Sequence, residues 1–208
     1  MFCCLCPDDS PIDKPVKITL VDKAARLECG SFESFNIHTN FALLGNHKEK
    51  ARLEAIELSL RPIKNTILKQ YKGNISVHMR VNIAPIDIFV CDDKVALEWV
   101  DLLDRHVKVY TPSLHVLDSR IITVLSSHYR SFVQQFGSIC FRRVFFDDAL
   151  NLKLPNCEKI CAIFYWLLTY KRDINDLDIG STGELSMMLH SACSDYRIRS
   201  LLNLFDKS

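Results

Sequence analysis

The sequence predicts an α+β protein whose first half is rich in strands and whose second half mixes strands with helices. Residues 75–83 alternate apolar with polar side chains, which is the pattern of a strand buried on one face. Apolar residues recur three and four positions apart from Ile121 to Phe136, which predicts a helix with one buried stripe. A Ser-x-x-Glu sequence at residues 181–184 is a helix-capping signature. Together these observations place a β-rich region before a helix-rich one.

The composition is that of a folded protein without a strong net electrostatic field. Of the 208 residues 48% are hydrophobic and 25% charged, and 26 Lys and Arg balance 25 Asp and Glu to a net charge of +1. Such a balance attracts neither a nucleic acid backbone nor an anionic membrane, so we expect neither as a partner. The nine cysteines, an odd number, favour a reducing compartment, and the predicted location is cytoplasmic or nuclear.

The first half begins with a flexible tail. Residues 1–15 contain three prolines and three aspartates, and alternating apolar residues then predict strands at 16–21 and 25–29. Residues 51–60 carry two patterns, since their Ala, Leu and Glu content suits a helix while Ile56, Leu58 and Leu60 alternate as in a strand. The alternation favours a strand that ends before Pro62.

A connector follows the strand at 75–83. Residues 92–94 carry a turn signal, and residues 95–103, which include Trp99, predict one or two helical turns. After Arg105 the pattern becomes richer in helices, so we place a domain boundary there. The predicted organisation is a tail at 1–15, a β-rich domain at 16–105 and a second domain at 106–208.

The second domain reads as a series of short elements. A hairpin of strands at 107–109 and 114–116 precedes a helix that Asp118 or Ser119 caps and Gly137 ends. Strands are then predicted at 142–146 and 150–154, followed by a helix that Asn156 caps and that buries Ile160 and its apolar neighbours. Two further helices are predicted, after Ser181 and at 198–205.

This order of elements resembles the BTB/POZ protein-interaction domain over about residues 106–205. Five segments carry the resemblance, namely Leu114-His-Val116, the helix signature in residues 124–132, the strand Leu152-Lys-Leu154, the helix end in residues 164–170 with Thr and Tyr in swapped order, and the ending in residues 188–198. The resemblance implies a BTB/POZ fold. Some BTB proteins carry a MATH β-sandwich before this domain, and residues 29–35 are similar to its early strand-turn-strand. The alternative is an unassigned β-rich domain that packs on the BTB unit.

The resemblance implies a protein-interaction adaptor that recruits an unidentified protein substrate to a cullin-RING E3 ubiquitin ligase, with the BTB domain forming a homodimer. In that family the region matching 127–137 helps to form the groove for the cullin scaffold. The implied partner-binding residues are Ser127, His128, Tyr129, Phe132 and Phe136. Gly137 and Ser138 stand where the family often has a Glu, which departs from the cullin-binding pattern. The alternative function is a BTB dimerisation scaffold or transcription cofactor without a ligase role.

Other groups of reactive residues favour no catalytic or metal site. Cys3, Cys4 and Cys6 suit acylation or a metal less well than a plain tail, and Cys157 and Cys161, spaced as on one helix face, are better read as buried thiols than as zinc ligands. Ser127 has Asp147 and Asp148 as available partners. However, the chain lacks a Gly-x-Ser-x-Gly elbow, a Gly-rich phosphate loop and a His-Glu-x-x-His helix. The sequence therefore predicts no enzyme, no cofactor and no metal.

Overall fold

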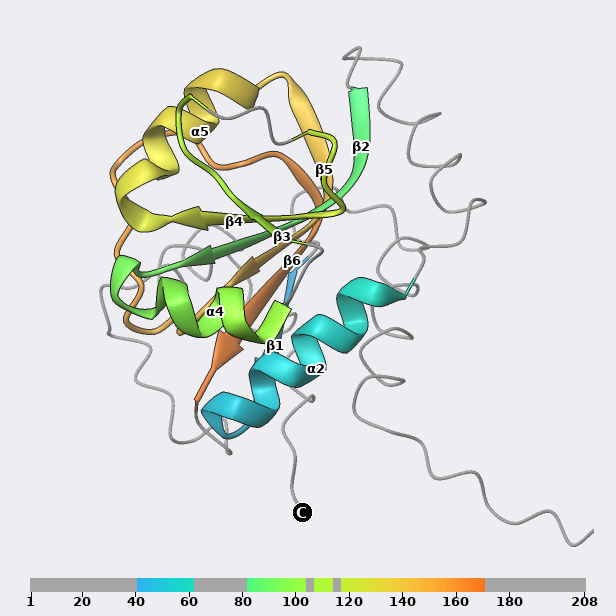
Figure 1. The fold of residues 1–208 in the computed structure, drawn as a ribbon, viewed down its shortest axis with the longest axis vertical. Coiled ribbons are helices and arrows are strands. Elements are labelled where there is room, and N and C mark those ends of the chain that lie inside the picture. The colour runs from blue at the N-terminus through green and yellow to red at the C-terminus, as the bar shows by residue number, and fades with distance from the viewer. Residues whose placement is uncertain (1–40, 62–81, 104–106, 114–116, 171–208) are drawn as a thin grey trace, which may run out of the picture.

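The computed structural model describes residues 41–61, 82–103, 107–113 and 117–170 (Figure 1). Several predicted elements lie outside these ranges. They are the strands at 16–21, 25–29 and 114–116, the first seven residues of the strand at 75–83, and the helices after Ser181 and at 198–205.

The core of the fold is one six-stranded sheet in which all neighbouring strands are parallel, in the order β1-β6-β5-β2-β4-β3. Parallel sheets are covered on both faces, so their strands are continuous apolar runs and do not alternate. β6 (Ala162–Thr169) illustrates this, because it has no charged residue and seven of its eight residues are buried. The strands are β1 (Phe41–Gly45), β2 (Asn82–Cys91), β3 (Val107–Val109), β4 (Ile121–Leu125), β5 (Ile139–Phe146) and β6 (Ala162–Thr169).

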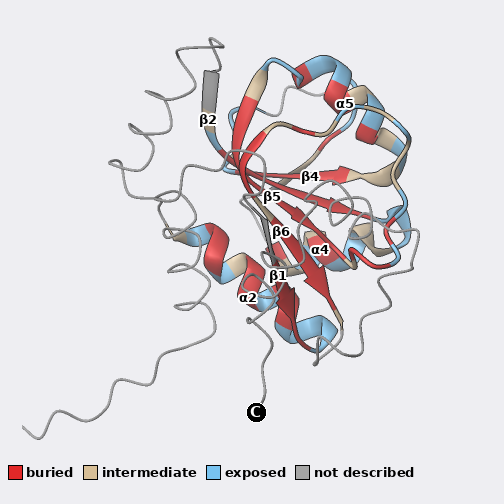
Figure 2. Cartoon of the chain, turned by 180° about the vertical axis from the view of Figure 1, so that it is seen from behind, coloured by how far each residue is buried: buried red, intermediate tan, exposed pale blue. Residues whose placement is uncertain are grey.

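Helices cover both faces of this sheet (Figure 2). α2 (Lys48–Leu60) and α4 (Ala96–Leu103) share a buried cluster with one face, through residues such as Leu58 and Trp99. α5 (Tyr129–Phe136) packs on the other face through Phe132 and Phe136. The connection from β2 through α4 to β3 and the one from β4 through α5 to β5 run in opposite directions across the sheet. Same-handed crossovers then require their helices to lie on opposite faces, as observed.

The strand β2 sits in the middle of the sheet although it contains Pro85, which cannot donate a ladder hydrogen bond. The register with β5 shifts between Ala84 and Asp87, so the proline falls at an irregularity. Asp87 is fully buried there and binds Arg142 through both carboxylate oxygens, at 2.7 and 2.5 Å. Arg142 and Arg143 also donate to the carbonyls of Ser59 and Arg61, which fixes the end of α2 against the sheet.

The predicted α+β fold, with a β-rich or MATH-like domain followed by a BTB/POZ domain, is wrong. The described residues form an α/β sheet with strands alternating with helices, whereas a MATH sandwich would be built from two stacked sheets. Three segments were assigned to the wrong class. Residues 51–60 belong to α2, residues 121–125 form strand β4 where a helix was predicted, and residues 162–169 form strand β6 where a helix was predicted. The strand predicted at 150–154 is a turn and an irregular segment.

Other local predictions are confirmed. Asp92 caps the 3-10 turn η2 (Asp93–Val95), α4 follows it, and residues 107–109 and 142–146 lie in strands. Gly137 lies at the C-terminal end of α5, as predicted. The division at residue 105 stays a prediction, although β1 and β2 from before that residue and β3 to β6 from after it share one sheet. Within the described part of the chain, no helix is both long and apolar enough to cross a membrane.

Candidate functional site

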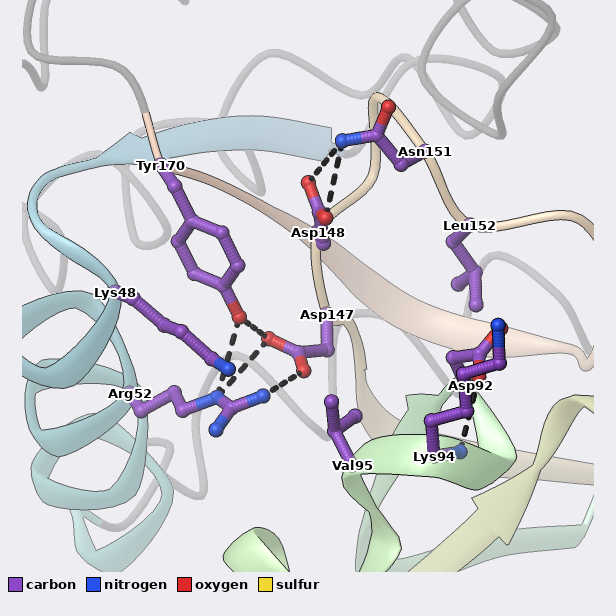
Figure 3. Close-up of a pocket in the computed structure, with 10 residues that line it drawn as sticks. All are labelled: Lys48, Arg52, Asp92, Lys94, Val95, Asp147, Asp148, Asn151, Leu152 and Tyr170. Carbon is purple, nitrogen blue, oxygen red and sulfur yellow. Dashed lines mark hydrogen bonds and ion pairs between the residues drawn. The ribbon is translucent and has the colours of Figure 1, made fainter.

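A pocket of about 200 Å³, lined mostly by charged and polar residues, opens at the carboxyl ends of the strands (Figure 3). Its walls come from segments that follow four different strands. They are Lys48 and Arg52 after β1, Asp92, Lys94 and Val95 after β2, Asp147, Asp148, Asn151 and Leu152 after β5, and Tyr170 after β6.

The strand order explains why a pocket forms here. β5 and β2 are neighbours, but the chain leaves β5 toward β6 and leaves β2 toward β3, in opposite directions across the sheet. Diverging connections leave a crevice outside the carboxyl ends of the two strands, and open α/β sheets bind their ligands in this crevice. The residues after β2 and β5 are the charged ones, Asp92 and Lys94 on one side and Asp147 and Asp148 on the other.

Asp147 lies at the inner end of the pocket, with only 3% of its side chain exposed. Its carboxylate accepts hydrogen bonds from Arg52 Nη2 at 2.6 Å, from Trp99 Nε1 at 2.7 Å and from the Tyr170 hydroxyl. Arg52 Nε adds a longer contact of 3.4 Å. A buried carboxylate needs such partners to stay ionised. Every strong donor around Asp147 therefore comes from the protein itself.

Arg52 lies one turn along α2 from Lys48, so both side chains reach the same wall. Its guanidinium bridges Asp147 and Glu98, and it lies 5.0 Å from the centre of the Trp99 ring. Burial alone would lower the pKa of Arg52, but the hydrogen bond and charge of Asp147, helped by Glu98, raise it above its ordinary value. The guanidinium is thus a permanent cation in the pocket.

Tyr170 closes the ring of contacts around Asp147. Its hydroxyl donates to Asp147 and accepts from Arg52 Nε at 3.1 Å. Burial first, and then the negative charge of Asp147, raises the pKa of the Tyr170 phenol well above its ordinary value. Tyr170 therefore keeps its proton and serves as a neutral donor.

The outer part of the pocket holds side chains that are more exposed. Lys48 Nζ lies 2.8 Å from Glu98, and nearly half of each side chain is exposed. Hydrogen bonds from Lys48 and then Arg52 lower the pKa of Glu98. Lys94 lies on the other side of Asp147 from Lys48 (Figure 3). The first turn of α2 also opens here, and His47 at its N-cap gives no side-chain cap to the helix amides.

Asp148 has a backbone that non-glycine residues rarely adopt, with φ at 47°. Its carboxylate accepts two 3.0 Å contacts from Asn151 Nδ2, and its carbonyl accepts from the amides of Asn151 and Leu152. The turn therefore sends Asp147 into the sheet edge and Asp148 away from it (Figure 3). Strained backbone of this kind is concentrated at functional sites.

The residues that the sequence assigned to a partner groove lie elsewhere. Ser127 and His128 belong to the 3-10 turn η4 (Ser126–His128), and Tyr129, Phe132 and Phe136 are buried along α5. None of the five lines the pocket. The structure therefore brings them together on one side of the sheet, and their assignment to a groove stays a prediction.

Cys157 and Cys161 have different surroundings from those expected, because they are free thiols, half-buried in and near the loop before β6, not on a helix face. Arg142 and Arg143, which lie side by side in β5, are both buried and paired with Asp87.

The sequence interpretation missed the pocket. Asp147 and Asp148 were considered only as partners for Ser127, whereas they end the apolar strand β5 at the sheet edge. The sequence signal that could have located the pocket is a buried strand followed directly by two carboxylates. This signal points to a site only when the strand is known to lie in a parallel sheet. Arg52 was missed because residues 51–60 were assigned to a strand.

Comparison with solved structures identifies a similar fold. The SWI2/SNF2 ATPase core of Sulfolobus solfataricus, solved in complex with double-stranded DNA, matches 81% of this chain with a TM-score of 0.53 and 12% sequence identity. This chain spans about a third of that protein's length, 34%. No protein-family model and no curated protein sequence matches the chain.

This match overturns several predictions from the sequence. The resemblance to BTB/POZ proteins is wrong, and so are the ubiquitin-ligase adaptor and the dimerisation scaffold that depended on it. The prediction that the protein is not an enzyme no longer stands, because the fold that matches is also found in an ATPase core; at 12% identity the match concerns the fold alone. The homodimer, the cullin scaffold and the protein substrate are not tested by this structure. The chain is thus similar in fold to that ATPase core, and its described strands form one parallel sheet.

Proposed function

We propose that this chain is a RecA-like nucleotide-binding domain that holds the phosphate groups of a nucleoside triphosphate between the ends of β2 and β5. The observation that carries this proposal is the position of the pocket at the switch point of the sheet. The likeness to an ATPase core agrees with nucleotide binding, although at 12% identity it concerns the fold alone.

The chemistry of the pocket supports an anionic ligand. Lys48, whose ammonium pairs with the half-exposed Glu98, and Lys94 bring positive charge from two sides, and the first turn of α2, to which His47 gives no side-chain cap, adds a partial positive charge. The negative charge of Asp147 is already compensated by Arg52. At about 200 Å³ the pocket is smaller than the roughly 300 Å³ at which small-molecule sites begin, so it suits a phosphate chain with the rest of the nucleotide outside.

Binding of a fluorescent ATP analogue to the full chain tests the proposal. We expect saturable binding that Lys48→Ala weakens about tenfold or more, because a charge-assisted hydrogen bond contributes roughly 1.5–3 kcal/mol. Lys108→Ala is the matched control, since Lys108 also forms an ion pair with a carboxylate, Asp118 at 2.6 Å, but lies outside the pocket. Absence of saturable binding, or equal losses in the two variants, would refute the proposal.

Phosphate release is measured in the same samples, with and without double-stranded DNA, since the similar protein is an ATPase core solved with that ligand. Asp148 is the pocket carboxylate tested for orienting a water molecule, because Asp147 is bonded to Arg52 and Trp99, Asp92 caps η2, and the Asp148 carboxylate accepts from the neutral amide of Asn151. Turnover that Asp148→Asn abolishes while analogue binding persists would assign hydrolysis to this pocket.

A further inference from the structure

We propose that the pocket binds its phosphate ligand without a divalent cation, because Arg52 occupies the position at Asp147 that a metal would need. This inference rests on the proposed function. It adds that the species bound is the free nucleotide rather than its magnesium complex. The argument has three parts, which concern the loop after β1, the carboxylate of Asp147 and the charge of Arg52.

The loop after β1 has no metal ligand of the usual kind. P-loop nucleotidases hold Mg²⁺ with the hydroxyl of a Ser or Thr that follows the loop lysine, and with an aspartate after a neighbouring strand. Here only Asn46 and His47 join β1 to α2, and Lys48 is followed by Glu49. Two residues are too few to wrap around a phosphate, and the Ser or Thr hydroxyl is missing at this position.

The aspartate after β5 is present, but its oxygens are taken. Asp147 Oδ2 accepts from Arg52 Nη2 at 2.6 Å and from Trp99 Nε1 at 2.7 Å, while Oδ1 accepts from Tyr170. A metal ion would have to displace the guanidinium from a carboxylate that is 97% buried. In the described ranges, no three His, Cys, Asp or Glu side chains are grouped so as to hold a metal ion. These residues do not fit a magnesium site.

Arg52 supplies at Asp147 the positive charge that a metal ion would otherwise supply. The guanidinium is held from three sides by Asp147, Glu98 and Tyr170. Burial lowers its pKa, but the hydrogen bond and charge of Asp147 raise the pKa above its ordinary value, so the side chain stays charged. Its planar fork matches carboxylate oxygens, and Asp147 and Glu98 already occupy it. The charge of Asp147 is therefore compensated within the chain.

Nucleotide binding measured with and without metal tests this directly. We expect the wild-type affinity for the fluorescent ATP analogue to differ by less than twofold between excess EDTA and excess Mg²⁺. An affinity at least tenfold higher with Mg²⁺ would overturn the inference and leave the proposed function intact. No binding in either medium would refute the proposed function, and this inference with it.

A second measurement detects metal at Asp147 without any nucleotide. Terbium luminescence excited through tryptophan reports an ion close to Trp99, whose indole nitrogen lies 2.7 Å from the Asp147 carboxylate. We expect wild type and Asp147→Asn to give the same signal, and Arg52→Gln to gain a saturable signal that Arg52→Gln/Asp147→Asn lacks. The double variant is the matched control, because it also removes Arg52 but leaves no buried charge.

A wild-type signal that Asp147→Asn abolishes would show that a metal reaches the carboxylate despite Arg52, and would overturn the inference. Equal signals from Arg52→Gln and the double variant would overturn the assignment of Arg52 as the group that excludes the ion. Both terbium results can be interpreted whether or not the protein binds nucleotide. The exclusion of metal from Asp147 is therefore tested separately from the proposed function.

Discussion

At the scale of single residues, the stability of the pocket depends on the balance between Asp147 and Arg52. Both side chains are 3% exposed, so each would be a buried, uncompensated charge without the other. A buried pair of this kind gains little over an apolar pair, but losing one partner costs about 3–5 kcal/mol. The network therefore contributes more to the geometry of the pocket than to the net free energy of folding.

Asp147→Ala should lower the free energy of unfolding by about 3–5 kcal/mol, because it leaves the Arg52 guanidinium buried without its main partner. Urea denaturation followed by circular dichroism measures the change. Asp118→Ala is the control, since the Lys108–Asp118 pair is exposed and such pairs contribute about 0–1 kcal/mol. A loss below 1 kcal/mol for Asp147→Ala would show that water reaches Arg52.

At the scale of elements, the sequence predicted some turns and helix ends better than it predicted which segments are helices and which are strands. The turn at 92–94 and the helix end at Gly137 depend on local chemistry, and both are observed. The strand predicted at 142–146 is observed too. By contrast, an apolar run that is buried on both faces has no period, so helix and strand look alike there. β6 is such a run, with seven of its eight residues buried, and it was predicted as a helix.

The strand prediction for the segment that contains α2 was wrong for a different reason. Its alternating Ile56, Leu58 and Leu60 suggested a strand, but only Leu58 is buried and Leu60 is 48% exposed. The buried set is Ala51, Ala55 and Leu58, spaced as on a helix, and two of these are small. The pocket could not be predicted from the sequence, because its walls meet only when the order of the parallel strands is known.

Gly137→Ala tests how α5 ends. The backbone of Gly137 is ordinary, with φ at −60°. Alanine would therefore raise the free energy of unfolding by about 0.4–1 kcal/mol if nothing else changed, because it reduces the conformational entropy of the unfolded chain. Its Cβ would however lie 2.8 Å from the Val133 carbonyl oxygen, and crowding typically costs about 1–3 kcal/mol. We expect a net loss of about 1 kcal/mol in urea denaturation, against less than about 0.5 kcal/mol for Ser138→Ala at the exposed neighbour. A gain in stability would mean that the end of α5 relaxes without cost.

At the scale of the whole molecule, the sheet connects the two halves of the chain. β2 lies between β5 and β4, and both of these partners come from after residue 105. The two buried clusters likewise combine residues from before and after that position, such as Phe89 with Phe145, whose rings stack at 4.5 Å. Each half therefore leaves large apolar surfaces uncovered when it is alone.

A fragment of residues 106–208 should show no cooperative unfolding transition in urea, because it lacks the central strand β2. The full chain, measured by the same circular dichroism signal, should unfold cooperatively. Mixing the fragment with residues 1–105 should restore part of the signal, since the missing strand is then supplied. Cooperative unfolding of the fragment alone would support an independent domain beginning near residue 106.

The central place of β2 has a consequence for synthesis on the ribosome. β2 emerges before either of its neighbours, since β4 and β5 are encoded later in the chain. The edge of β2 that pairs with β5, along Ile88, Phe89 and Val90, stays unpaired until translation has passed Phe146. Sheets that depend on such distant pairing fold slowly and expose aggregation-prone strands meanwhile. Nascent chains stopped between β2 and β5 should therefore be the ones that chaperones hold.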